Sequence, residues 1–133
     1  MLLADTSAWI EYLRATGSVC HERLRVAIEH GDPIATMGTV LMEVLAGAAD
    51  ERHANQLTRL LSSCATYVPL EEPNDHEAAA ALYRAGRTGG VTVRRSADCL
   101  IAAVAIRVRA TVLHRDADFD AIAQNSPLVV TSG

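Results

Sequence analysis

The stretch LLADTSAW, residues 2–9, passes from an apolar run to a polar turn and then into an amphipathic pattern. Leu2–Ala4 predicts a short buried strand, which Asp5, Thr6 and Ser7 end. Beyond them apolar residues recur at helical spacing, so we expect a helix to begin at Thr6 or Ser7. Asp5 would then lie at the carboxyl end of a strand, where its side chain can also cap the helix.

Strand and helix signals alternate along the rest of the chain. Further strands are expected at residues 34–36, 67–70, 111–114 and 128–131. Helices are expected at residues 19–30, 39–45, 50–63, 74–86, 96–109 and 119–123. Thr39 is the expected N-cap of the helix that Gly47 closes. This order predicts an α/β fold with a mainly parallel sheet, in which an active site lies at the carboxyl ends of the strands.

With 133 residues, half of them apolar, the chain can bury one core and is too short for two ordinary domains. We therefore expect a single domain over residues 1–133. No apolar stretch approaches the roughly 20 residues that cross a bilayer, and Asp5 interrupts the N-terminal apolar run before a signal-peptide core could form. These features predict a cytoplasmic protein without a membrane anchor.

The cysteine and lysine counts exclude several kinds of chemistry. Cys20, Cys64 and Cys99 lack the spacing of a zinc site, and their odd number argues against a disulfide framework. We expect them to be small buried hydrophobic residues. All twelve basic residues are arginine, so no mechanism that requires a catalytic lysine is available.

The formal charge of −4 argues at first sight against a nucleic-acid-binding surface. Five of the sixteen acids, however, are candidates for one metal site, and the other eleven face twelve arginines. The surface outside such a site would be close to neutral. A basic rim around the acids and scattered solvated arginines are both compatible with these counts.

The candidate acids lie far apart in the sequence, and each has a simpler explanation when taken alone. Glu43 lies among apolar residues, where an arginine partner or a solvent-facing position would account for it. Asp98 is in the first turn of an otherwise apolar helix, where the helix dipole favours an acid by about 0.3–1 kcal/mol. Asp116 and Asp118 follow a strand, and either could cap the next helix. Asp5 has the same alternative role as a cap.

One shared metal site explains all of these acids together. Carboxylates brought close to one another repel, and a divalent cation compensates that repulsion. Oxygen ligands without thiolates or paired histidines favour Mg²⁺ or Mn²⁺ over zinc. Such ions lower the pKa of a bound water and orient it toward a phosphodiester, and no Ser/His/Asp or Cys/His constellation indicates covalent catalysis instead. The acids therefore point to a metal-dependent nuclease.

The same segments resemble the PIN-domain ribonucleases, and among them the VapC-like toxins of bacterial toxin–antitoxin pairs. The likeness extends over nearly the whole chain and is most specific at Leu2–Trp9, Glu43, Asp98–Ala103 and His114–Asp120. It implies a three-layer α/β/α sandwich with a mainly parallel central sheet and Mg²⁺-dependent endoribonuclease activity on RNA. It also implies a homodimer and a VapB-like antitoxin that blocks the site and often helps to bind operator DNA.

The resemblance also implies a role for each acid at the expected site. The metal-binding and catalytic acids would be Asp5, Glu43, Asp98 and Asp116, with Asp118 as an auxiliary metal ligand. Whether Asp116 or Asp118 is the main C-terminal ligand stays open. Thr6 and Ser7 would help to hold a water or a phosphate.

Three arginines flank the proposed ligands in the sequence and are candidates for contacts to the RNA backbone. They are Arg94, Arg95 and Arg115. Guanidinium groups suit phosphate oxygens, which supports this role. Ion pairs with Glu71, Glu72 or Asp120 are the structural alternative for the same side chains.

Other protein classes that place an aspartate after the first strand fit less well. A haloacid-dehalogenase-like phosphatase needs a second aspartate two positions after Asp5, where this chain has Ser7. A response-regulator receiver needs a lysine, which the chain lacks. A catalytically silent PIN-like interaction or regulatory module is the remaining alternative, and the complete set of acids weighs against it.

Overall fold

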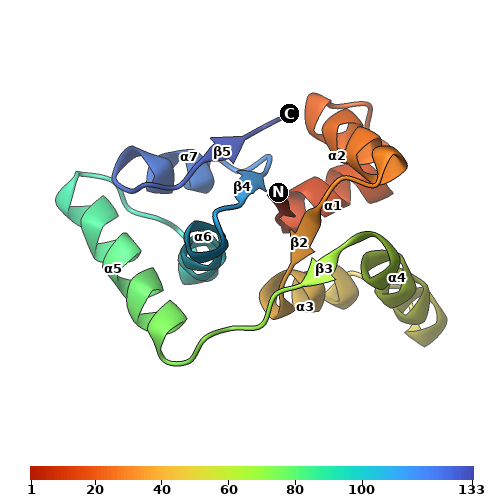
Figure 1. Cartoon of the computed structure of the whole chain (residues 1–133), viewed down its shortest axis with the longest axis horizontal. Coiled ribbons are helices and arrows are strands. Elements are labelled where there is room, and N and C mark those ends of the chain that lie inside the picture. The colour runs from red at the N-terminus through yellow and green to blue at the C-terminus, as the bar shows by residue number, and fades with distance from the viewer.

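The computed structural model describes all residues from Met1 to Gly133 and is built around one five-stranded parallel sheet (Figure 1). The strands are β1 (Leu2–Ala4), β2 (Ile34–Thr36), β3 (Thr66–Tyr67), β4 (Thr111–Leu113) and β5 (Val130–Thr131). Their order across the sheet is β3-β2-β1-β4-β5, and every pair of neighbours is parallel. The first strand of the chain is therefore the central one, with β2 and β4 on either side of it.

Seven helices connect and cover the strands. They are α1 (Thr6–Leu13), α2 (Val19–His30), α3 (Gly38–Ala46), α4 (Glu51–Cys64), α5 (Asn74–Thr88), α6 (Ser96–Val108) and α7 (Ala117–Gln124). In Figure 1, α1 and α2 lie on one side of the strands, and α5 and α6 lie on the other. The expected three-layer α/β/α sandwich is confirmed, and its sheet is wholly parallel.

The core lies between the sheet and the helices, with α6 as its most buried helix. Residues 101–105 of α6 are all buried, because this helix is apolar on nearly every face. Trp9, near the start of the sequence, and Phe119, near its end, are both completely buried. Cys20 and Cys99 are buried and Cys64 is half-buried, and all three are free thiols, as expected. None of the helices combines the length and the apolar character that crossing a bilayer requires.

Side-chain caps begin four of the seven helices, and the expected cap at Asp5 is among them. Asp5 accepts a hydrogen bond from the backbone N–H of Ala8 and so caps α1. Gly31 ends α2 in the left-handed region, with φ of 68°, where glycine carries no Cβ penalty. The expectation for Thr39 is wrong: α3 begins earlier, its N-cap is Met37, and no side chain caps it.

Several elements differ in extent from the sequence-based expectation, among them β3, β5 and α7. β3 ends at Tyr67 rather than residue 70, because its partner β2 ends at Thr36, whose carbonyl oxygen already accepts the backbone N–H of Val68. β5 begins at Val130 rather than residue 128, since the register pairs Val130 with Val112 and so places residue 128 before the start of β4 at Thr111. α7 begins at Ala117 rather than residue 119, because the Asp116 side chain accepts the backbone N–H two residues on and caps the helix there.

Candidate active site

The parallel arrangement places acids from distant segments at the carboxyl edge of the sheet. Asp5 directly follows the central strand β1, and Asp116 lies three residues after the adjacent strand β4. The backbone N–H of Asp5 donates to the carbonyl oxygen of Leu113 at 3.1 Å, which extends the pairing of these two strands. Both acids therefore lie where α/β folds bind their ligands.

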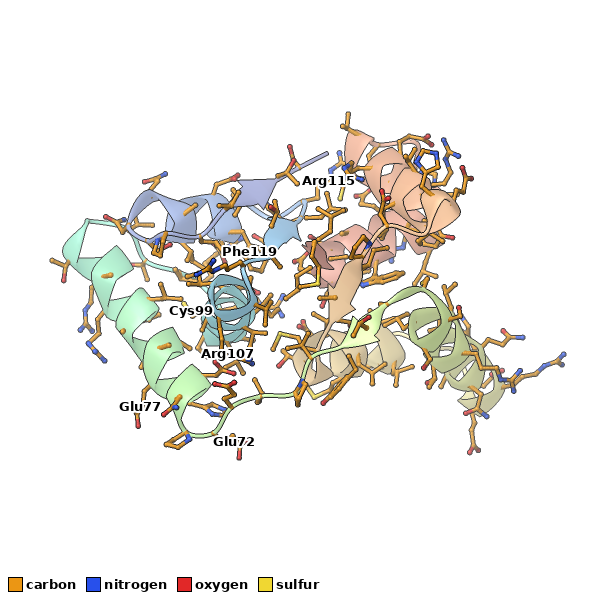
Figure 2. All side chains as sticks on the ribbon, viewed as in Figure 1. Glu72, Glu77, Cys99, Arg107, Arg115 and Phe119 are labelled. Atoms are coloured by element: carbon orange, nitrogen blue, oxygen red, sulfur yellow. The ribbon has the colours of Figure 1, made fainter.

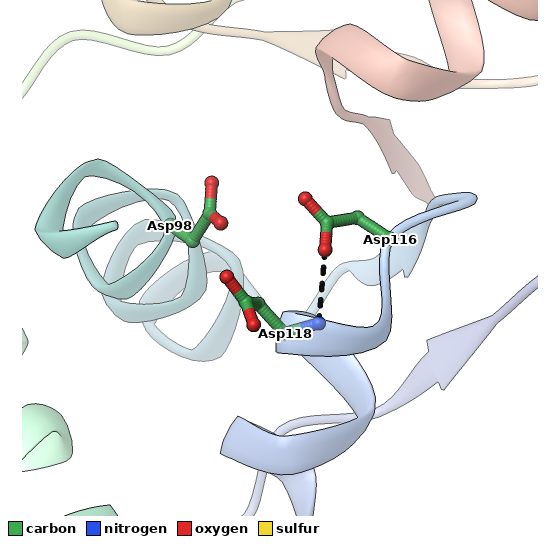
Figure 3. A group of neighbouring side chains, drawn as sticks. All are labelled: Asp98, Asp116 and Asp118. Carbon is green, nitrogen blue, oxygen red and sulfur yellow. Dashed lines mark hydrogen bonds between the residues drawn. The ribbon is translucent and has the colours of Figure 1, made fainter. Parts of the chain in front are cut away.

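Asp98, Asp116 and Asp118 form a cluster of three carboxyl groups, which we call the three-acid cluster (Figure 3). One oxygen from each side chain lies within 4.8 Å of the others. Asp98 comes from the first turn of α6, whereas the other two come from the start of α7. The backbone N–H of Asp118 donates to Oδ1 of Asp116 at 3.0 Å, which fixes the Asp116 side chain relative to the start of α7.

Asp98 is the most unusual member of the cluster. Its side chain is 2 % exposed, and its Oδ2 atom is buried without any hydrogen-bond partner. Burial raises the pKa of Asp98 to about 7; the positive charge of Arg95 opposes this shift, and the charges of Asp116, Asp5 and Asp118 add to it. A buried, unpartnered carboxylate of this kind is costly to the fold unless a cation compensates it.

Asp5 is also buried, but its side chain is well bonded. Ser7 donates its hydroxyl to Oδ1 of Asp5 at 2.6 Å, and the N–H of Ala8 donates to the same oxygen at 3.1 Å. Burial raises the pKa of Asp5, and these hydrogen bonds partly offset the effect. The Ser7 hydroxyl also accepts the backbone N–H of Arg115 at 2.8 Å. Ser7 therefore ties the start of α1 to the loop that carries Asp116.

Glu43 lies outside the three-acid cluster and has partners of its own. It is half-buried on α3, where the hydroxyl of Thr6 donates to Oε1 at 3.2 Å. Arg95 donates to its other oxygen, so the arginine partner considered as a simpler explanation is present. The hydroxyl of Thr6 thus donates to Glu43, as that of Ser7 does to Asp5. Arg95 links Glu43 to the three-acid cluster, since its charge also acts on Asp98.

Arg94 and Arg95 pair with acids of the candidate site, whereas Arg115 pairs with an acid outside it. The Arg94 side chain is 73 % exposed, yet its Nε lies 3.2 Å from Asp118 and its Nη2 lies 3.3 Å from Asp116. Arg115 pairs with Glu11 on α1 at 3.0 Å. The alternative in which these three arginines form ion pairs with Glu71, Glu72 or Asp120 is therefore wrong. The sequence predicts an arginine partner for Glu43 as one alternative, but it does not predict the partners of Arg94 and Arg115.

Arg94 competes with any cation for Asp116 and Asp118, so Arg94→Gln should strengthen Mg²⁺ binding several-fold in the absence of RNA. The arginine must release both carboxylates before they can coordinate a metal, and glutamine imposes no such charge competition. Isothermal titration calorimetry with MgCl₂ measures the affinity directly. Arg115→Gln is the matched control, because it removes the same charge from a side chain that pairs with Glu11 instead. Equal gains in the two variants would contradict the specific competition.

The donor set fits a hard divalent cation. Carboxylate oxygens dominate the cluster, and Oδ2 of Asp98 is a buried acceptor with no donor from the protein. Burial raises the pKa of the adjacent Cys99 thiol, so this residue stays protonated and is a poor ligand. Oxygen-only sites of this kind suit Mg²⁺ or Mn²⁺ rather than zinc.

Comparison with known proteins identifies the class to which this fold and this acidic site belong. The PIN domain family matches residues 2–125. Ribonuclease VapC11 from Mycobacterium tuberculosis and the VapC ribonuclease Mb1587 from Mycobacterium bovis are each 46 % identical over 133 residues, with 99 % of this chain and 98 % of the relative covered. The chain therefore belongs to the PIN-domain family, and within it to the VapC group.

Solved structures show the same fold at lower sequence identity. The DNA-bound VapBC2 structure from Rickettsia felis has a TM-score of 0.75 at 15 % identity, covering 98 % of this chain and 96 % of that one. The FitAcB structure from Neisseria gonorrhoeae has a TM-score of 0.71 at 23 % identity, covering 99 % and 97 %. These likenesses support the three-layer architecture alone.

Proposed function

We propose that this protein is a Mg²⁺-dependent endoribonuclease that hydrolyses RNA phosphodiester bonds as the toxin of a toxin–antitoxin pair. One observation carries the metal-dependent part of the proposal. The buried Oδ2 of Asp98 has no partner and belongs to the cluster that brings Asp98, Asp116 and Asp118 within 4.8 Å of one another. Membership of the VapC ribonucleases supports RNA as the substrate. Mn²⁺ would suit the same oxygens.

In this proposal the acids coordinate the metal, and neighbouring hydroxyl groups orient the acids through hydrogen bonds. The ligands are Asp5, Glu43, Asp98, Asp116 and Asp118. Bound there, Mg²⁺ would acidify a water nucleophile and stabilise the negative charge that develops on the phosphate and the leaving oxygen. Ser7 fixes the rotamer of Asp5 through its hydroxyl, and Thr6 orients Glu43 in the same way. This preorganisation keeps the carboxylates in place before substrate arrives.

Arg94, Arg95 and Arg115 are the proposed contacts to the RNA backbone. The Arg94 and Arg95 side chains are 73 % and 49 % exposed and already contact the acids. A phosphate entering the site would therefore find cationic donors beside it, and these donors could exchange a carboxylate for a phosphate oxygen. Charge reversal at Arg94 and Arg95 that left RNA cleavage and its salt dependence unchanged would contradict this role.

We further propose a VapB-like antitoxin as the partner of a homodimeric toxin that acts in the cytoplasm. A cleft of about 300 Å³ between α1, α3 and α4 is lined by the apolar side chains of Ile10, Leu13, Val44 and Leu57, and Glu43 also lines it. An apolar antitoxin segment bound there would reach the site acids. The VapBC2 structure from Rickettsia felis contains promoter DNA, and we expect operator DNA to contact this chain only indirectly, through the antitoxin.

The metal dependence can be tested within the motif of residues 116–120. RNA cleavage is expected in Mg²⁺, none in EDTA, and at least a tenfold loss in Asp118→Asn, because a neutral amide is a weak ligand for Mg²⁺. Asp120→Asn is the matched control: it lies in the same turn of α7, but its carboxylate is exposed and faces His114 outside the cluster. Its cleavage rate should stay close to that of the wild type. Gel analysis of a 5′-labelled RNA measures all of these rates.

Two outcomes would contradict the proposed function. Cleavage that persists in EDTA would exclude a metal-dependent mechanism. An absence of cleavage by the wild-type protein in both Mg²⁺ and Mn²⁺, with the fold intact, would instead support the catalytically silent module.

A further inference from the structure

A groove of about 800 Å³ runs between α5 and α6 and opens beside the three-acid cluster. Its floor includes Ala79 of α5 and Cys99 of α6, and Figure 2 shows Cys99 between these two helices. Small side chains along both walls, such as Ala80 and Ala97, leave the space between the helices open. The groove belongs to no part of the proposed metal site, although it borders it.

The groove is lined by three arginines and by no carboxylate. Arg84 and Arg87 project from α5, and Arg94 lies at the end of the groove nearest to the acids. Neither Arg84 nor Arg87 forms an ion pair, whereas Arg94 pairs with Asp116 and Asp118. In a chain with a formal charge of −4, uncompensated cations gathered in one groove mark a site for an anion.

The remaining lining is mostly apolar and includes one aromatic side chain. Seven of the twelve lining residues are hydrophobic, and Tyr83 is half-buried on the α5 wall. An inorganic anion would gain nothing from such surroundings. A nucleotide presents a phosphate to arginine and a flat base to an aromatic ring, so its chemistry matches both features.

The position of the groove connects it to the site of cleavage. Arg94 contacts the three-acid cluster and also lines the groove, and Cys99 directly follows Asp98 in α6. The lining of α5 extends from His76 to Arg87, which is about 16 Å along the helix axis. A strand whose phosphate lies at the acids could therefore continue into the groove for a few nucleotides.

We propose that the α5–α6 groove binds the single-stranded RNA next to the cleaved bond, with Arg84 and Arg87 on its phosphates and Tyr83 against a base. This inference rests on the proposed ribonuclease function and adds to it a subsite that selects the flanking nucleotides. An unstructured strand is required, because the bases of a duplex are not free to enter a groove lined by an aromatic side chain.

The test measures RNA affinity in EDTA, where the metal-dependent reaction is absent. Fluorescence anisotropy with a short unstructured fluorescein-labelled RNA compares wild type with the double variant Arg84→Gln/Arg87→Gln. The double variant should bind at least about tenfold more weakly at low salt, and its slope of log K against log salt should fall by about 1.4, or 0.7 for each lost phosphate contact. Arg52→Gln/Arg59→Gln is the matched control, because both side chains are exposed and unpaired on α4, away from the groove. It should leave both quantities unchanged.

A second variant separates base contact from charge. Tyr83→Leu keeps an apolar side chain but removes the aromatic face, so binding should weaken about tenfold while the salt slope stays as in wild type. Thermal unfolding checks that the variant is folded. The arginine variants alone keep the test decisive if Tyr83→Leu is unstable.

RNA affinity tests the groove, and RNA cleavage in Mg²⁺ or Mn²⁺ tests the proposed function, so the two can fail separately. Equal RNA affinity in both double arginine variants overturns the groove assignment, even if wild-type cleavage in Mg²⁺ is intact. Unchanged RNA affinity with an altered oligomeric mass in sedimentation overturns it in favour of a contact between subunits. RNA binding that depends on Arg84 and Arg87 in a protein that cleaves nothing in Mg²⁺ or Mn²⁺ supports the groove and refutes the nuclease.

Discussion

Asp98→Asn should reduce Mg²⁺-dependent RNA cleavage by at least about a hundredfold, since loss of even an outer-shell partner of a metal ligand costs roughly 10- to 100-fold. Asp98 supplies the one buried oxygen of the cluster that no protein group satisfies. An amide of the same shape keeps the packing and removes the charge that would attract the cation. Initial cleavage rates across a Mg²⁺ titration measure the loss, and higher Mg²⁺ should restore only a small part of it.

The same substitution should stabilise the metal-free protein at neutral and alkaline pH. Burial raises the pKa of Asp98 to about 7 from an ordinary 3.8, so the folded state holds its proton more tightly than the unfolded state does. Stability from this group is greatest below pH 3.8 and is lost as the pH rises through 7. Asparagine removes that loss, which we expect to be on the order of 2 kcal/mol at pH 8.

Denaturant unfolding in EDTA at pH 5 and pH 8 provides the measurement. Wild type should lose more stability than Asp98→Asn between these two pH values, and added Mg²⁺ should stabilise wild type much more than the variant. Asp32→Asn is the control, because Asp32 is exposed in the loop before β2. A variant at position 98 that kept wild-type cleavage and wild-type pH dependence would refute the central role of this residue.

Arg107→Ala should cost about 3 kcal/mol of stability, because it would leave a buried carboxylate without its cation. Arg107 lies in the last turn of α6 (Figure 2). Its guanidinium group donates to both oxygens of Asp75, at 3.0 and 2.9 Å. It also donates to the carbonyl oxygen of Pro69 at 2.9 Å and to Glu71 at 3.2 Å. Asp75 is only 2 % exposed, so water cannot replace these bonds.

The pH dependence of this loss has a defined sign. Burial by itself raises the pKa of Asp75, but the hydrogen bonds from Arg107 and from the backbone of Glu71 outweigh it and hold the pKa below its ordinary value. The stability that this pair contributes is therefore present above the ordinary aspartate pKa and is lost as the pH falls through the lower folded value. The deficit of Arg107→Ala should shrink in acid.

Arg25→Ala provides the contrast between a buried and an exposed ion pair. Arg25 on α2 donates to Glu22 and Glu29 with distances as short as 2.7 Å, but all three side chains are largely exposed. Solvent screens such pairs, so the loss of stability should be much smaller than for Arg107→Ala. Urea unfolding of both variants measures the difference. Equal losses would show that burial of Asp75 does not decide the energy of its pair.

Much of the fold follows from local sequence patterns. The apolar run of Leu2–Ala4 and the polar residues after it predict a strand, an N-cap and a helix, and all three form where expected. Errors arose where a local signal competed with another element. Residues 68–70 have the composition of a strand, yet their partner strand β2 ends at Thr36, and α3 begins before Thr39 without any side-chain cap. Such boundaries depend on which backbone groups find partners across the sheet.

The position of the candidate site follows from the sequence in part, for a topological reason. Parallel strands share one carboxyl edge, so the sequence alone predicts Asp5 and Asp116 at that edge. The assignment of all five acids to a metal is still a proposal. The geometry joins Asp98, Asp116 and Asp118 most closely, so both members of the C-terminal pair are near Asp98, and Glu43 has a separate partner.

The sequence by itself determined the order of strands and helices, the edge of the sheet that carries the acids and the exclusion of lysine and thiolate chemistry. These properties depend on residue types and on periodicities within single segments. Only the tertiary structure decided that Arg95 pairs with Glu43, 52 positions away, and that Arg94 pairs with Asp116 and Asp118. It also decided that the unpaired Arg84 and Arg87 line a groove between α5 and α6 that contains no carboxylate. The interaction energy of two charged side chains depends on the distance between them in space and on their burial. Neither quantity can be read from the spacing of residues along one segment.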